Sequence, residues 1–346
     1  MIRRLIALAS LLILIGGIAV GAYAWYNWKA MQAPLTLPQA GVTYQLEAGT
    51  TLRSLSRDLA RRGWVANPWY VEIWGRWVEP GGSVQAGEYD LEPGMHIADV
   101  LALLRKGKAK QYRITVLEGS RFRDFALQLA DLVDKGQIRA TVGPQGYAAM
   151  FRELTGESHE EGWIFPDTYQ YSRGDTDRSL LLRAYRRMRS VLDQAWTHRT
   201  AGLPLKSAYE ALILASIVEK ETGVADERAT IAGVFIRRLN KGMKLQTDPT
   251  VVYGMGERYK GNIHKADLRQ DTPYNTYTRK GLPPTPIALP GAGSIEAAVH
   301  PNDTGALFFV AKGGGRHYFS KTYREHRKAV IKYLLGGDKK RYRGDS

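Results

Sequence analysis

The chain has 346 residues, enough to bury a sizeable core and to form two domains. Lys and Arg outnumber Asp and Glu by 49 to 34, a formal net charge of +15, and the lack of cysteine excludes disulfides and thiolate chemistry. A positive surface suits nucleic acid, anionic lipid or an acidic polymer. We expect no nucleic-acid partner, because the sequence has no zinc-finger spacing, no RNP-type aromatic strand and no P-loop.

An uncharged and mostly apolar segment, residues 5–26, follows the first four residues. A helix needs about 20 apolar residues to cross the hydrocarbon core of a bilayer, so this segment predicts one transmembrane helix. Arg3 and Arg4 precede it, which predicts that the N-terminus stays cytoplasmic and that everything after Lys29 is exported. Aromatic residues typical of a membrane interface lie where the helix would emerge: Trp25, Tyr26 and Trp28.

A cleaved signal peptide is the alternative for this segment, because Ala22-Tyr23-Ala24 matches a small-x-small cleavage site. The apolar run is longer than the roughly 7–15 residues of a signal-peptide core, and bulky aromatics directly follow the cleavage site. Both observations favour an uncleaved, single-pass anchor in the cell inner (cytoplasmic) membrane, with the C-terminal part extracytoplasmic.

A linker and a small module are predicted next. Residues 30–42 contain two prolines and predict an extended linker. Residues 43–110 predict a strand and a helix twice in succession, with an aromatic-rich helix between them that Asn67 caps and Pro68 begins. This order resembles the LysM fold, a module that binds N-acetylglucosamine polymers; a purely structural role is the alternative.

A larger domain is predicted for residues 111–346. It begins with a strand at residues 112–117 and contains amphipathic helices near residues 122–133 and 177–198. Residues 243–304 are rich in Gly, Pro, Asn and Thr, and we expect loops to fill them.

Residues 207–223 predict a buried helix. Ser207 and Glu210 have the spacing of a capping box, so the helix should begin at Ala208, and Gly223 should end it. Residues 211–218 are apolar apart from one serine, and a helix that is apolar all round belongs inside a protein.

The end of this helix carries Glu219-Lys220-Glu221. Helical spacing places the two carboxylates on different sides of the helix. The negative end of the helix macrodipole and burial both raise the pKa of a carboxyl there, and a protonated carboxyl can protonate a glycosidic oxygen. A solvated helix end is the alternative, and spacing alone favours it.

Five sequence motifs, which occur in the same order, resemble the endolytic murein transglycosylases of the YceG-like family. The resemblance covers nearly the whole chain; Thr285, where the family usually has Gly, and Leu289 depart from it. The motifs are residues 161–169 (Glu-Gly-Trp-Ile-Phe-Pro-Asp-Thr-Tyr), 215–222 (Ala-Ser-Ile-Val-Glu-Lys-Glu-Thr), 245–253 (Leu-Gln-Thr-Asp-Pro-Thr-Val-Val-Tyr), 273–277 (Pro-Tyr-Asn-Thr-Tyr) and 281–284 (Gly-Leu-Pro-Pro).

The resemblance implies that Glu219 is the catalytic residue and that it acts twice. It first protonates the oxygen that leaves C1 of N-acetylmuramic acid (MurNAc). As a carboxylate, it then removes a proton from the C6 hydroxyl of the same sugar, which closes a 1,6-anhydro ring. The reaction uses no water and no cofactor, so the second carboxylate of ordinary glycosidases is not needed.

Several polar residues near these motifs are candidates for binding sugar hydroxyls and acetamides, although each is equally suited to stabilising a turn. Asp248 before Pro249 suggests an Asx-type turn. For Glu161 we expect a structural role. His317 and His326 lack the neighbours of a metal site, so no metal is expected. The substrate-binding candidates are Gln246, Thr247, Tyr274, Asn275 and Glu221.

The predicted fold class is α+β. Residues 1–29 form a cytoplasmic stub and transmembrane helix, 30–42 a linker, 43–110 a LysM-like module and 111–346 a mixed α/β YceG-like catalytic domain. The predicted function is endolytic cleavage of the bond between MurNAc and N-acetylglucosamine (GlcNAc) in nascent peptidoglycan, with the cytoplasmic membrane and cell-wall synthases as further partners. The alternatives are a water-using muramidase, with Asp248 or Glu221 as second carboxylate, and a non-catalytic membrane-anchored scaffold.

Overall fold

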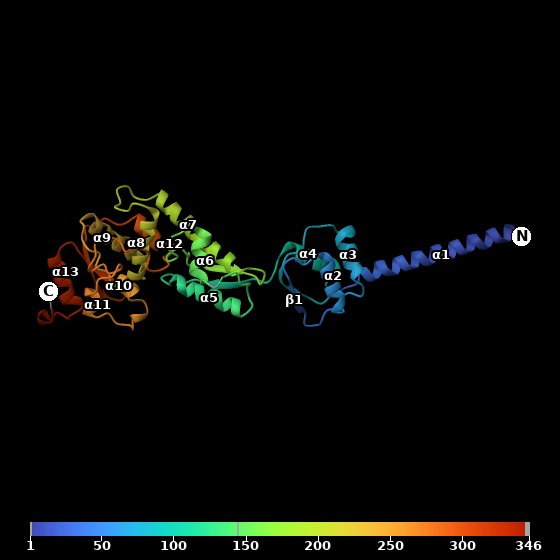
Figure 1. The fold of residues 1–346 in the computed structure, drawn as a ribbon, viewed down its shortest axis with the longest axis horizontal. Coiled ribbons are helices and arrows are strands. Elements are labelled where there is room, and N and C mark those ends of the chain that lie inside the picture. The colour runs from blue at the N-terminus through green and yellow to red at the C-terminus, as the bar shows by residue number, and fades with distance from the viewer. Residues whose placement is uncertain (1, 144, 343–346) are drawn as a thin grey trace. The chain divides into compact units, whose positions relative to one another are not determined.

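The computed structural model describes residues 2–143 and 145–342, which form two compact units with the elements labelled in Figure 1. The mixed α/β fold that the sequence predicts is confirmed. Unit 1 comprises Met1–Tyr112, Gly136–Arg139 and Gln170–Asp175, and unit 2 comprises Arg113–Lys135, Ala140–Tyr169 and Thr176–Ser346.

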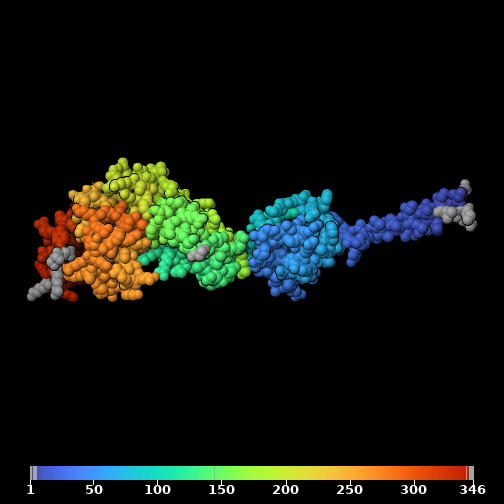
Figure 2. Space-filling model, in the orientation of Figure 1, coloured from blue at the N-terminus to red at the C-terminus, as the bar shows by residue number. Residues whose placement is uncertain are grey.

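The helix α1 of unit 1 contains the segment predicted to cross a membrane. It spans Ile2–Met31, and its part Ile6–Met31 has a mean hydropathy of 2.3. Its apolar side chains are exposed along most of its length, and Figure 2 shows the helix uncovered on the visible face. The predicted N-terminal apolar helix is confirmed, and it is long and apolar enough to span a bilayer.

The rest of unit 1 is a small module around one antiparallel strand pair. β1 and β2 pair with Tyr44 opposite Tyr89, and both tyrosines are buried against the helices. The side chain of Asn67 accepts a hydrogen bond from Trp69 N at 3.0 Å, which confirms the predicted cap. The elements are β1 (Val42–Leu46), α2 (Leu52–Arg61), α3 (Pro68–Ile73), the π-helix η1 (Trp74–Val78), β2 (Gly87–Leu91) and α4 (Ile97–Lys106).

The segment between α1 and β1 is attached to this module. Leu35 is 5% exposed, and its N–H donates to the carbonyl of Met95 at 2.8 Å. Thr36 N donates to the carbonyl of Trp64 at 3.0 Å. Asn27, still within α1, accepts a hydrogen bond from the Tyr70 hydroxyl at 2.8 Å. These bonds fix the end of α1 to the module on both sides of Met31.

The strand pair β3 and β4 lies where the chain passes from one unit to the other. β3 spans Tyr112–Thr115 and β4 spans Thr168–Tyr171. Beyond β3, Val116 N donates to the carbonyl of Asp167 at 3.0 Å, which fixes the start of the segment that leads into unit 2.

A buried helix, α8, forms the centre of unit 2, as the apolar sequence predicts. Every residue from Ala211 to Val218 is buried, and α7, α9, α10 and α12 contact the helix (Figure 1). The helices of unit 2 are α5 (Phe122–Asp134), α6 (Gly146–Thr155), α7 (Asp177–Thr197), α8 (Ala208–Glu221), η2 (Ala225–Glu227), α9 (Arg228–Asn240), α10 (Asp248–Met255), η3 (Gly256–Arg258), α11 (Lys265–Arg269), α12 (Ala292–Val299), α13 (Tyr323–Tyr333) and η4 (Lys339–Arg341).

The C-terminal part of unit 2 is a hairpin with a helix packed on it. β5 (Phe308–Gly313) pairs antiparallel with β6 (Arg316–Ser320), and α13 contacts both strands. The side chain of Thr322 caps α13 by accepting from Glu325 N at 3.2 Å.

The prediction that loops fill residues 243–304 is wrong, because α10, α11 and α12 lie within them. α12 consists largely of Ala, Gly and Ser. Without knowledge of the helix against which it packs, this composition predicts a loop. In the fold these small side chains allow α12 to pack closely on α8, and burial stabilises the helix. α8 ends at Glu221, two residues before the predicted stop, because Thr222 is extended, with φ −146° and ψ 133°.

Candidate active site

The C-terminal turn of α8 carries the glutamates that the sequence marks for acid–base chemistry. Ser207 begins the helix and accepts a hydrogen bond from Glu210 N at 3.3 Å. The carboxylate of Glu210 accepts from Lys206 N at 2.7 Å, so the predicted capping box forms with its second bond shifted by one residue. Ser216, the one polar residue in the buried stretch, accepts from Ile287 N at 3.0 Å and so holds a distant loop against the helix.

The carboxyl of Glu219 is nearly enclosed, with its side chain 6% exposed. Its Oε2 accepts a hydrogen bond from the backbone N–H of Gly291 at 3.0 Å. Its Oε1 lies 3.8 Å from Nη2 of Arg228. One backbone donor and one guanidinium therefore stand beside this carboxyl.

Two chain segments form a wall beside Glu219. Gly119 and Leu289 pair through backbone bonds, with Gly119 N donating to the Leu289 carbonyl at 2.9 Å and Leu289 N donating to the Ser120 carbonyl at 2.8 Å. Lys220 Nζ donates to the carbonyl of Gly119 at 3.0 Å. The helix end, residues 118–120 and residues 289–291 are thus joined around the carboxyl.

A second carboxylate, Glu118, lies at the same wall. Its Oε2 is 3.4 Å from Nη2 of Arg228, the guanidinium that also faces Glu219. A Cβ atom on Gly291 would lie only 1.8 Å from Glu118 Oε1, so glycine at this position gives the Glu118 side chain its space. Sequence reasoning did not identify Glu118, Arg228 or Gly291, because none belongs to a local motif and Gly291 is 72 residues from Glu219.

Glu221 points to a different environment from Glu219. Its Oε1 accepts a hydrogen bond from the Thr247 hydroxyl. Burial raises the pKa of its carboxyl to about 7, the negative charge of Asp248 acts in the same direction, and the Thr247 bond and Arg238 oppose them. The sequence-based expectation of a raised carboxyl pKa at this helix end holds for Glu221.

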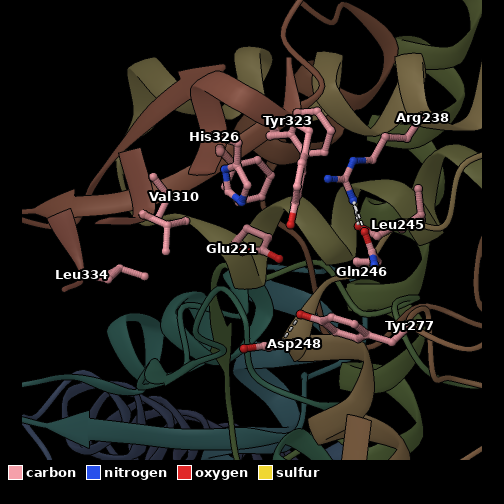
Figure 3. A pocket seen from close by; sticks show the side chains of 13 residues that line it. Glu221, Arg238, Leu245, Gln246, Asp248, Tyr277, Val310, Tyr323, His326 and Leu334 are labelled. Carbon is pink, nitrogen blue, oxygen red and sulfur yellow. Dashed lines mark hydrogen bonds between the residues drawn. The ribbon is translucent and has the colours of Figure 1, made fainter. Parts of the chain in front are cut away.

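A cavity of about 370 Å³ opens beside Glu221 (Figure 3). Arg238 forms one wall and donates to the Leu245 carbonyl at 2.8 Å and to Gln246 Oε1 at 3.3 Å. Tyr277 donates to Asp248 Oδ1 at 2.6 Å on the opposite side. The lining residues are Glu221, Arg238, Leu245, Gln246, Asp248, Tyr277, Phe308, Phe309, Val310, Tyr323, His326, Val330 and Leu334.

Gln246 is the one described non-glycine residue with a positive φ, 52°. Such backbone strain costs of order 1–3 kcal/mol in a side chain-bearing residue and concentrates at functional sites. Here it places the Gln246 side chain at the rim of the cavity, next to Arg238 (Figure 3).

The other predicted substrate-binding residues contact the protein itself. Asn275 is 1% exposed, and its amide donates to the carbonyls of Asp267, Leu268 and Gln270 at the end of α11. Thr247 is 2% exposed and bonded to Glu221. The Tyr274 hydroxyl lies 2.9 Å from the Thr285 hydroxyl. Of the five candidates, Glu221 and Gln246 line the cavity; a binding role for the other three stays a prediction.

Two carboxyls with different surroundings lie at the end of the buried helix α8, and comparisons with known proteins give the family of the chain. The sequence profile of the YceG-like family matches residues 44–332. This is more than half of the chain, so the chain belongs to the YceG-like family, and the resemblance seen in the motifs is confirmed.

Proteins from three bacteria are similar to this chain. An endolytic murein transglycosylase of Bacillus subtilis (strain 168) is 35% identical over 272 residues, which cover 74% of this chain and 75% of that protein. One of Streptococcus pneumoniae serotype 2 (strain D39 / NCTC 7466) is 25% identical over 363 residues, which cover 94% of this chain and 64% of that protein. The crystal structure of the yceG-like protein lmo1499 from Listeria monocytogenes is 28% identical, with a TM-score of 0.50 over 84% of this chain and 100% of that chain.

Proposed function

We propose that this chain is an endolytic murein transglycosylase that cleaves the MurNAc–GlcNAc bond of nascent peptidoglycan strands and leaves 1,6-anhydro-MurNAc ends. The proposal rests on the family, on the names of its relatives and on the surroundings of Glu219. The observation that carries it is the nearly enclosed Glu219 carboxyl beside one backbone N–H and one guanidinium.

The proposed reaction uses Glu219 in both of its protonation states. The protonated carboxyl gives its proton to the glycosidic oxygen as the bond from that oxygen to C1 breaks. The resulting carboxylate removes the proton of the C6 hydroxyl, and O6 bonds to C1. The proton count of Glu219 is restored. Gly291 N–H and Arg228 support the carboxylate between the two steps.

The cavity beside Glu221 is the proposed binding site for a neighbouring sugar of the strand. It combines aromatic faces with carboxylate, amide and guanidinium groups, the mixture that sugar rings and their hydroxyls require. Its volume of about 370 Å³ falls in the range of small-molecule sites. Glu221 and Gln246 are the proposed polar contacts there.

A water-using muramidase is the second candidate function, and Glu118 is the observation that favours it. A hydrolase needs a second carboxylate to activate water or to form a covalent intermediate. Glu118 shares Arg228 with Glu219, a relationship that neither Asp248 nor Glu221 has.

Product analysis in H₂¹⁸O separates these functions. Peptidoglycan strands are digested with the full chain in labelled water, and the products are examined by mass spectrometry. We expect unlabelled products that are lighter by one water than the hydrolysis products. Labelled reducing ends would establish the muramidase and refute the ring closure, whereas uncut strands would leave only a binding scaffold.

We also propose that α1 anchors the protein in the cytoplasmic membrane with unit 2 outside the cytoplasm. The support is the apolar stretch Ile6–Met31 and the basic pair Arg3-Arg4 before it. An anchor near the site of glycan synthesis favours newly made strands and cell-wall synthases as neighbours. Intact mass of the membrane-extracted protein tests the anchor; a mature chain that begins at Trp25 would contradict it.

A LysM-like role in glycan binding is proposed for residues 43–110. A cavity of about 700 Å³ lies in this module between the start of α2, Gly75 and residues 80–84. Arg105 lines it, and its buried Nε has no hydrogen-bond partner among the described residues, which favours a polar ligand.

A further inference from the structure

A third cavity, in unit 2, has no part in the reaction described above. Its volume is about 470 Å³, and it opens between the start of α5, the helix α6 and Tyr253 of α10. Its walls combine two arginines, two glutamates and a histidine with small and aromatic side chains. They include Arg121, Ala126, Ala148, Glu160, Glu161 and Tyr253.

Glu161 joins two walls of this cavity. It is 5% exposed; its Oε1 accepts from Phe122 N at 2.8 Å and its Oε2 accepts from the Tyr253 hydroxyl at 3.3 Å. Burial raises the pKa of this carboxyl to about 7, so a large fraction of it is uncharged near neutral pH. Glu161 therefore fixes α5 relative to α10 without supplying a full negative charge to the cavity.

Arg121 is a cation of this cavity, and its charge opposes the rise in the pKa of the Glu161 carboxyl. Its guanidinium lies 4.9 Å from the ring centroid of Tyr253, and no described carboxylate comes within 4.0 Å of it. Two nearby arginines differ, since Arg123 pairs with Glu257 at 2.8 Å and Arg152 pairs with Glu160 at 2.7 Å. A guanidinium that has no ion pair within 4.0 Å and stacks on an aromatic ring is suited to bidentate recognition of a carboxylate.

The cavity lies close along the chain to the wall of the Glu219 site. Gly119, whose carbonyl accepts from Lys220, is two residues before Arg121. Two residues span at most about 7 Å of chain, so the Cα of Arg121 is within that distance of the Cα of Gly119. One short chain segment therefore contributes both to the wall of the Glu219 site and to the lining of this cavity.

We propose that this cavity binds the acidic stem peptide carried by the MurNAc residue that is cleaved, with Arg121 bound to a peptide carboxylate. The inference rests on the proposed function, because it takes peptidoglycan as the substrate. Stem peptides combine free carboxylates with alanine methyl groups. The carboxylates are complementary to Arg121. The methyl groups are complementary to the small and aromatic surface of Ala126, Ala148 and Tyr253.

The test compares strands that bear stem peptides with the same strands after an amidase has removed the peptides. Cleavage by the detergent-solubilised full chain is measured for wild type, Arg121→Gln and the control Arg186→Gln, an exposed arginine on α7. We expect Arg121→Gln to lower kcat/KM about tenfold on peptide-bearing strands, the effect of one charge-assisted hydrogen bond, and less than about twofold on stripped strands. Arg186→Gln should leave both rates unchanged.

Equal losses on both substrates, or no loss on either, would overturn the proposal. Ala148→Glu places a negative charge on the opposite wall and should reproduce the substrate-selective loss, so the test survives if Arg121→Gln destabilises the fold. Strand binding measured in a Glu219→Gln background tests the peptide site separately from the proposed function. If wild type cleaves neither substrate, the proposed function fails. Tighter binding of peptide-bearing strands that is lost in Arg121→Gln would still support the peptide site, and equal binding of both strands would refute it.

Discussion

Glu219 and Glu221 are two residues apart in the last turn of α8, yet their carboxyls bond to different parts of the chain. Glu219 accepts from the N–H of Gly291, and Glu221 accepts from the hydroxyl of Thr247. The helix therefore separates two carboxyls of similar sequence context into two chemical environments. This separation allows each carboxyl to be tested with the other as its control.

Glu219→Gln should abolish cleavage while glycan binding and folding persist. Glutamine is nearly isosteric and can still accept the Gly291 hydrogen bond, but it cannot transfer a proton, so we expect a loss of at least about 10²–10⁴ in kcat. Glu221→Gln should cost much less, because that carboxyl is bonded to Thr247 and lies on the other side of the helix. Steady-state rates and thermal unfolding of both variants check this; the reverse ranking would assign the acid to Glu221.

The hydrogen bond from Gly291 to Glu219 can be tested by a matched pair of substitutions. Gly291→Ala keeps the N–H, whereas Gly291→Pro removes it, and the native φ of −77° suits both residues. Both substitutions add the same Cβ against Glu118, so its side chain has to move in both variants and the comparison isolates the N–H. We expect Gly291→Pro to be slower than Gly291→Ala by about tenfold, since hydrogen bonds to charged groups are worth about 1.5–3 kcal/mol. Equal rates for the two variants would show that this N–H does not assist the reaction.

Glu118→Gln distinguishes a neighbouring charge from a second catalytic carboxylate. In the proposed transglycosylase, Glu118 acts only through Arg228, so the variant should lose less than about tenfold in rate. In a muramidase the same change would remove the group that handles water, and cleavage should fall as far as in Glu219→Gln. Initial rates on purified strands decide between these outcomes.

The buried carboxyl of Glu221 predicts a loss of stability as the pH rises. Its pKa is raised from 4.5 to about 7 in the folded chain, so between these values the folded state holds a proton that the unfolded state has released. Stability therefore falls with increasing pH across this window, by about 1.4 kcal/mol per unit and on the order of 3 kcal/mol in total. Glu161, with a similar pKa, adds a second contribution of the same sign.

Glu221→Gln should remove the first of these contributions. Thermal unfolding measured at several pH values from 5 to 8 should show a weaker fall in Tm with increasing pH for this variant than for wild type. Glu153→Gln, at an exposed position on α6, is the control. If wild type and Glu221→Gln kept parallel profiles, Glu221 would not be protonated in the folded chain.

Gly82→Trp should weaken glycan binding by the module without changing the chemistry. A Cβ on Gly82 meets nothing within 4 Å, so a large side chain fits there and fills the cavity that Arg105 lines. Glu92→Trp, at an exposed position outside that cavity, is the matched control. Co-sedimentation with insoluble peptidoglycan should show weaker binding for Gly82→Trp alone. Equal binding by both variants and wild type would leave the module a structural role.

Local pattern was enough to predict the elements that depend on near neighbours. The cap at Ser207 and the apolar run to Val218 predict α8, because a helix that is apolar on every side has to be buried. α12 was missed because its small residues become helical only against α8, a partner about 80 residues away in the sequence.

The candidate site, too, was predictable only where the signal was local in the sequence. Motifs identified Glu219, and helical spacing separated it from Glu221. The partners Gly291 and Arg228 come from other segments, and no periodicity or local spacing indicates which distant loop faces a given side of a helix. The left-handed backbone of Gln246 was equally hidden, since glutamine carries no sequence signal for a positive φ.

The hydrogen bonds that fix the end of α1 to the module have a mechanical consequence. α1 has 30 residues and is about 45 Å long, whereas the hydrocarbon core of a bilayer is about 30 Å thick. With α1 in a membrane, the helix continues past the lipid into a module to which Asn27 and Leu35 are both bonded. The module then has a fixed height above the bilayer and no swivel at its base. A change in bilayer thickness alters the tilt of α1, and the module must tilt with it.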